Sequence, residues 1–295
     1  MLLKTDESAL IKLIAEKSGV PVDSIGLSEI TGGSISSTYK VRVNHSPLYF
    51  VKVHETGEFP DLLEKELHGL DFLARQKIIR VPGVTGHLRT SSLQILILEW
   101  IEQVAPTQLF WEIFGERLAA LHKTNDDMFG FYEDNYMGSL LQVNRFTESW
   151  IDFFIQQRLH PQMQLAFNRG LLSRQQLSLF ESLYKKIGLV FNEEKPALLH
   201  GDLWSGNFIS AADGQPVLID PAVYSGHRSM DLGMTTLFGG FEKAFYESYH
   251  YHFPLPGNYR EQWNLCNMYP LLIHLNLFGR SYLPGIEAVL KKFAN

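Results

Sequence analysis

The segment LLHGDLWSGNFI, residues 198–209, carries the strongest signal in this chain, together with VLIDPA at 217–222. Asp202 and Asn207 stand five positions apart in a short loop, and Asp220 ends an apolar strand 18 residues after Asp202. Phosphoryl transfer needs such groups, because one carboxylate orients the attacking hydroxyl while an amide oxygen and a second carboxylate hold Mg²⁺ against nucleotide phosphates. The segment therefore predicts Asp202 as the catalytic base and Asn207 and Asp220 as magnesium ligands.

The loop differs from its counterpart in protein kinases, which reads H-R-D-x-x-x-x-N and is followed by D-F-G. Here HGD at 200–202 is followed by Asn207, and the later aspartate opens the triplet DPA at 220–222. The absence of D-F-G and A-P-E signatures argues against a protein kinase. Each residue alone has an ordinary explanation, since an Asp often caps a helix and an Asn often occupies a turn. The prediction of a catalytic site rests on their combination.

The chain divides into two regions of different character. The patterning predicts a small antiparallel sheet with one inserted helix in the first hundred residues, and mostly helices after them. Predicted strands are 25–30, 37–43, 48–54 and 93–101; predicted helices are 6–17, 61–76, 107–123, 147–169, 173–191 and pieces of 229–250 and 260–292; VPGVTG at 81–86 is expected to be a loop. We therefore expect an α+β fold with two lobes, a nucleotide-binding lobe over residues 1–101 and a helical lobe with the catalytic loop and substrate site over 102–295. A cleft between two lobes favours ligand binding.

The first lobe supplies the candidate nucleotide-binding residues. Gly32 and Gly33 stand in a turn between strands, where backbone N–H groups can approach phosphate oxygens, although such a pair also suits a simple hairpin. Lys52 lies inside an apolar strand and needs a partner if it faces inward, and Glu66 on the following helix is the expected one. At the junction between the lobes, Glu99, Trp100 and Ile101 could present backbone groups to an adenine, although an ordinary linker also fits these residues.

Composition limits the classes of partner. The chain has 295 residues with 26 Lys plus Arg against 32 Asp plus Glu, a net charge of −6, which argues against nucleic acid as the main partner. No apolar run approaches the roughly 18 residues that cross a bilayer, and the N-terminal residues do not resemble a secretory signal. The single cysteine, Cys266, fits a reducing compartment. We expect a cytoplasmic protein without a membrane partner; its oligomeric state stays open, and a monomer is compatible with the sequence.

On these motifs the chain resembles the fructosamine kinase (ketosamine-3-kinase) family, within the aminoglycoside phosphotransferase-like branch of the protein-kinase-like fold. HGDLWSGN at 200–207 is the most specific motif. The accompanying segments are MGSLLQVN at 137–144, WIDFFIQQRLHPQ at 150–162, IDPAVYSGHRSMDLGM at 219–234 and YPLLIHLNLFG at 269–279. The resemblance extends from about residue 8 to the C-terminus.

The resemblance implies ATP-dependent, Mg²⁺-assisted phosphorylation of a sugar hydroxyl, at O3, on a small or protein-bound ketosamine such as a fructosamine or ribulosamine. By position it implies that Asp202 is the base, that Asn207 and Asp220 bind Mg²⁺, that Lys52, paired with Glu66, binds phosphate, and that Gly32 and Gly33 belong to the nucleotide loop. Trp204 and the 137–144 segment would lie towards the sugar, and His200 is placed with them, although it is also expected to order the loop. Some relatives carry a Cys where Ser34 stands, so no thiol switch is expected in this loop.

Two other function classes stay open. The chain could be another small-molecule kinase of the same fold, acting on an aminoglycoside, a choline-like alcohol or another metabolite. It could also be a non-catalytic nucleotide-binding scaffold. The accompanying segments favour a ketosamine kinase over the first, and the complete set of Lys52, Asp202, Asn207 and Asp220 argues against the second. Asp231 either holds the backbone of the catalytic loop or caps its own helix.

Overall fold

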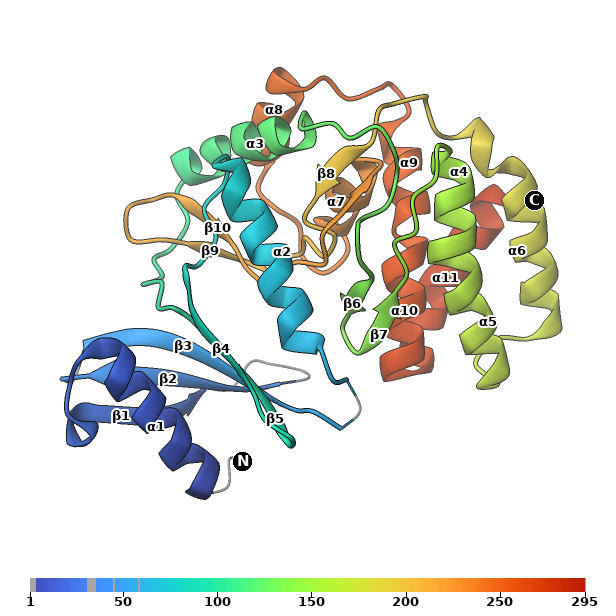
Figure 1. The fold of residues 1–295 in the computed structure, drawn as a ribbon. Coiled ribbons are helices and arrows are strands. Elements are labelled where there is room, and N and C mark those ends of the chain that lie inside the picture. Colours follow the sequence, from blue (N-terminus) through green and yellow to red (C-terminus); the bar gives the residue numbers. More distant parts are fainter. Residues whose placement is uncertain (1–3, 31–35, 45, 58, 295) are drawn as a thin grey trace.

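The computed structural model describes residues 4–30, 36–44, 46–57 and 59–294, which form two lobes of unequal size (Figure 1). The smaller lobe is built on a five-stranded antiparallel sheet with the strand order β1-β2-β3-β5-β4. Its elements are α1 (Lys4–Ser18), β1 (Ile25–Ile30), β2 (Ser37–Val43), β3 (Ser46–Glu55), α2 (Leu62–Gln76), β4 (Val84–Arg89) and β5 (Leu93–Glu99), with a 3₁₀ turn at Val22–Ser24. The predicted turn at Gly32 and Gly33, like Ser34, lies outside the described residues.

Apolar alternation produces this sheet and one of its covering helices. Val41, Val51 and Ile97 on three neighbouring strands are fully buried. Leu10 and Ile14 of α1 pack onto the same apolar cluster. Because successive strand residues point to opposite faces, the alternation that buries these side chains also fixes the register of the strands. The predicted antiparallel sheet and inserted helix are confirmed.

The prediction of a loop at 81–86 was wrong for residues 84–86, which belong to strand β4. Val84 lies opposite Leu98 in β5, and the strand continues to Arg89. The register shifts between Val84 and Gly86, which is the irregularity that a glycine in a strand often marks. The proline and glycines of VPGVTG are typical of a loop, and the sequence therefore did not indicate this edge strand, which pairs with β5.

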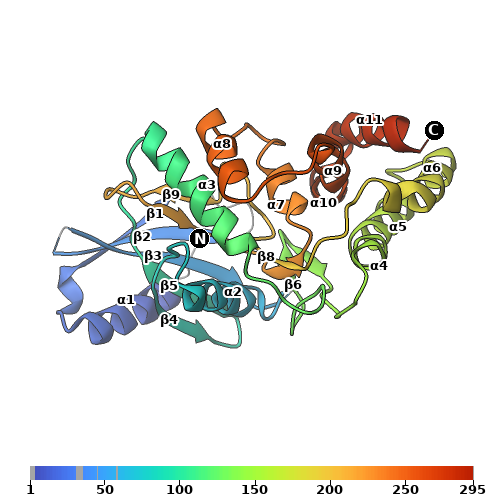
Figure 2. The ribbon, with the colours of Figure 1, turned by 90° about the horizontal axis from the view of Figure 1, so that it is seen from above.

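The larger lobe is mostly helical (Figures 1 and 2). Its helices are α3 (Gln108–His122), α4 (Trp150–Phe153), α5 (His160–Asn168), α6 (Arg174–Lys186), α7 (Ser229–Met234), α8 (Lys243–His252), α9 (Tyr259–Cys266), α10 (Met268–Phe278) and α11 (Leu283–Phe293), with a π-helical turn at Phe154–Leu159 and 3₁₀ turns at Ile187–Leu189 and Arg280–Tyr282. Three short antiparallel pairs complete it: β6 (Asn135–Met137) with β7 (Leu140–Gln142), β8 (Ala197–Leu199) with β11 (Tyr224–Gly226), and β9 (Phe208–Ser210) with β10 (Pro216–Leu218). Two lobes of these kinds confirm the expected α+β fold.

Helix α2 connects the lobes, because it belongs to the smaller lobe by sequence yet packs on the larger one (Figure 1). A Cβ added to Gly69 of α2 would lie 3.3 Å from Pro221 and 3.4 Å from Val223, so this face of the helix lies directly against the larger lobe. The chain itself crosses between the end of β5 at Glu99 and the start of α3 at Gln108. The expected boundary after residue 101 falls in this connection and stays a prediction. None of the described helices has the length and apolarity to cross a lipid bilayer.

Candidate active site

A buried lysine joins the sheet of the smaller lobe to helix α2 and to the larger lobe. Lys52 lies on β3 between Thr38 and Leu96 of the neighbouring strands, and only 6% of its surface is exposed. Its Nζ lies 2.8 Å from Glu66 Oε1 and 2.6 Å from Asp220 Oδ1. Burial lowers the pKa of Lys52, but the two carboxylates outweigh burial and leave the pKa above its usual value. Lys52 is therefore a fixed positive charge where the lobes meet.

The two carboxylates around this lysine lie in different surroundings. Burial raises the pKa of Glu66 to about 7, while Lys52 opposes this rise and Asp220 adds to it. The side chain of Asp220 is 45% exposed, and its backbone φ of 55° is a left-handed conformation that Asp adopts more readily than most residues. Glu66 is therefore enclosed against Lys52, whereas Asp220 keeps carboxylate surface that a ligand can reach.

The catalytic loop brings Asp202 and Asn207 together. Asn207 Nδ2 donates hydrogen bonds to the backbone oxygen of Asp202 at 2.8 Å and to its Oδ2 at 3.0 Å. The loop is tied to the segment around Asp220, because Ile219 donates its N–H to the oxygen of Asn207. Burial raises the pKa of Asp202 to about 7; the hydrogen bond from Asn207 opposes the shift, and Asp220 contributes to it. A carboxyl with a pKa near neutrality is suited to accept a proton in a general-base step.

Gly201 allows the catalytic loop to pass close to the backbone of Ala222. The φ of Gly201 is 87°, and a Cβ there would collide with the carbonyl group of Ala222. The Ala222 N–H in turn donates to the oxygen of His200 at 2.9 Å. The middle residue of the HGD motif is therefore a steric requirement of the turn.

Asp231 holds the backbone of this loop. Its Oδ2 accepts the N–H of His200 at 2.8 Å, and its Oδ1 accepts the N–H of Gly201 at 2.9 Å. His122 at the end of α3 adds a third hydrogen bond, Nε2 to Asp231 Oδ2 at 3.1 Å. Burial alone would raise the pKa of Asp231, yet these donors outweigh it and hold the pKa below its usual range. Of the two roles left open for Asp231, the contacts favour support of the loop over capping, since the hydrogen bonds of its side chain go to His122, His200 and Gly201.

His200 is fully buried, and both of its ring nitrogens are engaged. Nδ1 accepts the N–H of Asp202 at 3.3 Å, and Nε2 lies 2.9 Å from the oxygen of Ile219. Because a carbonyl oxygen only accepts, the proton of the neutral ring is on Nε2. Burial lowers the pKa of His200, which favours this neutral form. The geometry supports a role in ordering the loop and leaves no exposed surface of this ring for a substrate.

At the junction of the lobes, two of the three expected residues use their N–H groups within the smaller lobe. Glu99 donates to Gly83 O at 2.8 Å, and Trp100 donates to Leu48 O at 3.1 Å. The N–H of Ile101 has no hydrogen-bond partner within the described part of the chain, so it is a free donor at this junction, and its role towards an adenine stays a prediction. The side chain of Ile101 belongs to a small apolar cluster with Ala211, Val217, Ile209 and Ile219. Ile101, Ala211 and Val217 are buried in this cluster, and Ile209 and Ile219 are its partly exposed members.

The segments expected near the sugar differ in exposure. Trp204 is half-buried, and its ring lies across Gly206, where a Cβ would collide with the indole. In the 137–144 segment, Gln142 is buried; its Nε2 donates to Ala222 O at 3.2 Å and its Oε1 accepts from Tyr269 OH at 3.0 Å. Gln142 therefore braces the segment that follows Asp220, and Trp204 is the more accessible of the two.

The chain matches the family model described as fructosamine kinase over residues 7–295. It belongs to the fructosamine kinase family. Among curated relatives, it is 38% identical to a probable ketoamine kinase of Enterococcus faecium over 90% of this chain and 94% of that protein. It is 36% identical to a probable ketoamine kinase of Synechocystis over 95% of this chain and 94% of the relative. A chloroplastic protein-ribulosamine 3-kinase of rice is 34% identical, over 91% of this chain and 78% of that protein.

Solved structures agree with membership of this family. A Thermobifida fusca protein assigned as a fructosamine-3-kinase superposes with a TM-score of 0.86 at 30% identity, covering 96% of this chain and 98% of the other. The aminoglycoside phosphotransferase APH(2'')-IIa, solved with gentamicin, has a TM-score of 0.65 at 16% identity, covering 99% and 96%, and this likeness shows the fold alone. As a fructosamine kinase family member, the protein is a phosphotransferase that uses ATP and an alcohol acceptor.

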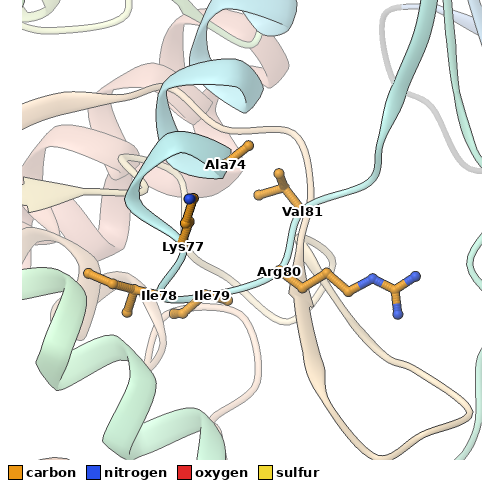
Figure 3. Close-up of a pocket in the computed structure, with 6 residues that line it drawn as sticks. All are labelled: Ala74, Lys77, Ile78, Ile79, Arg80 and Val81. Atoms are coloured by element: carbon orange, nitrogen blue, oxygen red, sulfur yellow. The ribbon is translucent and has the colours of Figure 1, made fainter.

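One surface hollow lies apart from the candidate active site around Lys52 and Asp202. It is lined by Ala74, Lys77 and the residues 78–81, where the chain leaves helix α2 (Figure 3). None of the residues around Lys52 or Asp202 lines it. The backbone here serves the fold, since Arg80 O accepts the N–H of Leu218 at 2.9 Å. We assign no chemistry to this hollow.

Sequence reasoning missed two residues that support the site. His122 stands in an apolar helical stretch, where a single histidine is ordinarily read as part of the core. Glu133 lies in a loop, yet its carboxylate binds Lys65 and His68 of α2 at 2.7 and 2.9 Å. Neither residue has a local pattern that reveals its partner, because both partners are distant in sequence.

Proposed function

We propose that the protein transfers the γ-phosphoryl group of ATP to O3 of a ketosamine, with Asp202 accepting the proton of the attacking hydroxyl. The observation that carries this proposal is the meeting of Lys52, Asp220, Asp202 and Asn207 where the two lobes join. These residues come from a strand of the smaller lobe and two loops of the larger one. Such a set serves positioning and charge stabilisation, which are the main needs of phosphoryl transfer.

The donor atoms suit Mg²⁺. Asn207 is oriented by its Nδ2, which donates twice to Asp202, so its Oδ1 is the atom left to bind a cation. Asp220 adds an exposed carboxylate. The described residues contain no cluster of three or more His, Cys, Asp or Glu side chains that could hold a metal. Two oxygen ligands are in keeping with Mg²⁺, which retains waters and binds substrate phosphates. When bound, the ion would neutralise charge on the phosphates.

The chain's own residues would do the rest of the work. Lys52, held by Glu66, would bind a phosphate oxygen as a permanent cation. Asp202 would orient the acceptor hydroxyl and accept its proton, while Asp231 keeps the loop backbone in place. The N–H of Ile101 would bind the adenine edge. The names of the relatives, ketoamine kinase and protein-ribulosamine 3-kinase, support a ketosamine as the acceptor.

The proposal is tested by turnover and by the position of the phosphate. Fructosamines, ribulosamines and erythrulosamines should be phosphorylated in preference to the free ketoses, and phosphorus–proton correlation NMR should place the phosphate on O3. Asp202→Asn should lower kcat by about 10²–10⁴-fold while nucleotide binding persists. Asp213→Asn, an exposed aspartate, is the matched control. Equal turnover of the free sugar, or phosphate on a primary hydroxyl, would favour a different small-molecule kinase.

A further inference from the structure

A cluster of aromatic rings adjoins the catalytic loop and is not used by the chemistry described above. Four half-buried rings from separate segments form it: Trp204, Phe238, His274 and Tyr282, with the exposed Phe278 at its margin. The ring centroids of Phe238 and His274 are 4.5 Å apart, and those of His274 and Tyr282 are 4.9 Å apart. Trp204 meets Phe238 edge to face at 6.1 Å. The cluster thus begins two residues from Asp202.

The rings of the cluster are held in place by their neighbours. The indole of Trp204 is packed over Gly206 of the same loop. Among the described residues, the indole Nε1 of Trp204 has no hydrogen-bond partner. This atom is also not one of the buried polar atoms that lack a partner, so its N–H is open to solvent. The cluster therefore presents fixed aromatic surfaces with an open N–H donor, as a built binding surface does.

His274 gives the cluster one hydrogen-bond acceptor. Its Nδ1 lies 2.7 Å from the carbonyl oxygen of Pro270, which can only accept, so Nδ1 carries the proton. Nε2 of the neutral ring is then an acceptor, and no described residue occupies it. Burial lowers the pKa of His274, which favours the neutral ring. A protonated imidazole would lack this acceptor and would repel a cationic ligand.

The ring contacts connect this acceptor to the catalytic loop, since His274 packs on Phe238 and Phe238 packs on Trp204. Tyr269 lies on the same helix as His274. Burial raises the pKa of Tyr269 to about 12, Arg158 opposes this rise, and the charge of Asp202 contributes to it. Tyr269 OH donates to Gln142 Oε1 at 3.0 Å, and Gln142 Nε2 donates to Ala222 O at 3.2 Å, so helix α10 packs beside the segment that follows Asp220. A substrate that presents a hydroxyl to Asp202 can extend from there towards the rings.

We propose that the rings of Trp204, Phe238 and Tyr282 bind the amine end of the ketosamine, and that His274 Nε2 accepts a hydrogen bond from the protonated amine. This inference rests on the proposed function. A sugar carries several hydroxyls, which call for several donors and acceptors, whereas the cluster offers aromatic faces, one acceptor and the single N–H donor of Trp204. A protonated secondary amine has an N–H to donate, a positive charge that aromatic faces attract, and an apolar substituent to cover. The cluster matches the amine better than the sugar.

The test compares an N-alkyl fructosamine with its ether analogue, in which oxygen replaces the amine nitrogen. Binding of both compounds is measured by calorimetry without nucleotide, and KM is measured with ATP. His274→Phe keeps a ring and removes the acceptor, and His274→Gln restores an acceptor near the Nε2 position. His160→Phe, an exposed histidine on α5, is the matched control.

We expect the wild-type protein to bind the amine more tightly than the ether. His274→Phe should weaken amine binding and raise its KM by about tenfold, with ether binding and the KM for ATP unchanged. His274→Gln should recover part of this loss, and His160→Phe should behave as wild type. Equal effects of His274→Phe on amine and ether, or no effect on either, would overturn the inference.

The two measurements separate the two proposals. If ketosamines are phosphorylated on O3 but His274→Phe does not change their binding, the amine site is wrong and the proposed function stands. If the amine compound binds in a His274-dependent way but is never phosphorylated, the proposed function is wrong and the amine site stands.

Discussion

His122 Nε2 lies 3.1 Å from Asp231 Oδ2, and both side chains are buried next to the catalytic loop. His122 Nδ1 is 2.8 Å from the hydroxyl of Tyr249, so the histidine connects α8 to the aspartate that binds the loop backbone. Asp231 is thereby fixed from one side by an imidazole and from the other by two N–H groups. Asp231 therefore acts on Asp202 through the backbone of His200 and Gly201, the two residues that precede it. Among the described residues, neither His122 nor Asp231 forms a hydrogen bond with Asp202 itself.

Asp231→Asn should impair catalysis through the loop backbone. The amide has one oxygen, so it cannot accept all three hydrogen bonds, and a buried donor left without an acceptor costs about 1–3 kcal/mol. We expect a lower melting temperature and a drop in kcat of at least tenfold, with a smaller change in the KM for ATP. Steady-state kinetics and thermal unfolding measure both effects.

His122 supplies the control for this prediction. His122→Gln keeps a donor that can reach Asp231, whereas His122→Leu does not, so the glutamine variant should retain more activity. Wild-type kcat and stability in Asp231→Asn would show that the loop needs no such support.

Glu133→Gln should loosen helix α2, which carries Glu66. The carboxylate of Glu133 lies 2.7 Å from Lys65 Nζ and 2.9 Å from His68 Nδ1, and thus ties the helix to the larger lobe. Because Glu66 holds Lys52, we expect the KM for ATP to rise severalfold. The free energy of unfolding should change by only about 1 kcal/mol, since the groups are partly exposed. Glu148→Gln, an exposed loop residue, is the matched control, and an unchanged KM for ATP in Glu133→Gln would refute the role.

The sequence predicted the parts of the site that local patterns encode. The β-branched and aromatic residues around it located Lys52 in a strand, helical spacing located Glu66 on a helix, and the loop motif located Asp202 and Asn207 in one loop. The contacts between residues that are distant in sequence could not be predicted in this way. His122 and Asp231 are 109 residues apart, and the contact exists because α3 and the loop pack on the same core. No local pattern encodes such a contact.

Elements of two kinds also escaped the sequence. Strand β4 directly follows a proline and a glycine, which are typical of loops. It forms because it pairs with β5, and its own sequence shows no clear alternation. The strands β6 and β7 have three residues each, which is too short for periodicity to show. This short pair positions Gln142, which binds Ala222 O in the segment after Asp220, so a part of the site depends on elements that only tertiary structure reveals.

His227 should make the stability of the protein depend on pH in the mildly acidic range. Its side chain is buried between the rings of Trp150 and Phe191, and Nδ1 accepts the N–H of Ser229 at 3.2 Å. Burial lowers the pKa of His227 from 6.5 to about 4. Between these two values the unfolded chain binds a proton that the folded chain does not, so stability is complete above pH 6.5 and is lost as the pH falls towards 4.

The measurement is the free energy of unfolding in urea between pH 7.5 and pH 4.5. His227→Asn should be less stable at every pH because it removes a packed ring. Its stability should nevertheless fall less steeply on acidification than that of the wild type, by up to a few kcal/mol over the range. The comparison of slopes cancels the buried carboxyls, which titrate in both proteins. Identical slopes would exclude His227 as the titrating group, and His160→Asn, an exposed histidine, should leave the slope unchanged.

Thiol oxidants should not switch this enzyme off reversibly. The segment that we expect to bind nucleotide, which lies outside the described residues, carries Ser34, and Cys266, the single thiol of the chain, is fully buried in α9. Burial raises the pKa of Cys266 well above its usual value, so the thiol stays protonated, and the thiolate is the form that peroxide attacks. We expect activity to persist in peroxide at concentrations that inactivate an exposed low-pKa cysteine, with Cys266→Ser behaving like the wild type. Slow loss through methionine oxidation would not be restored by a thiol reductant, which separates it from cysteine chemistry. A loss of activity that dithiothreitol restores and that Cys266→Ser abolishes would show that α9 opens enough to expose the thiol, because peroxide cannot reach a side chain that stays closed in the core.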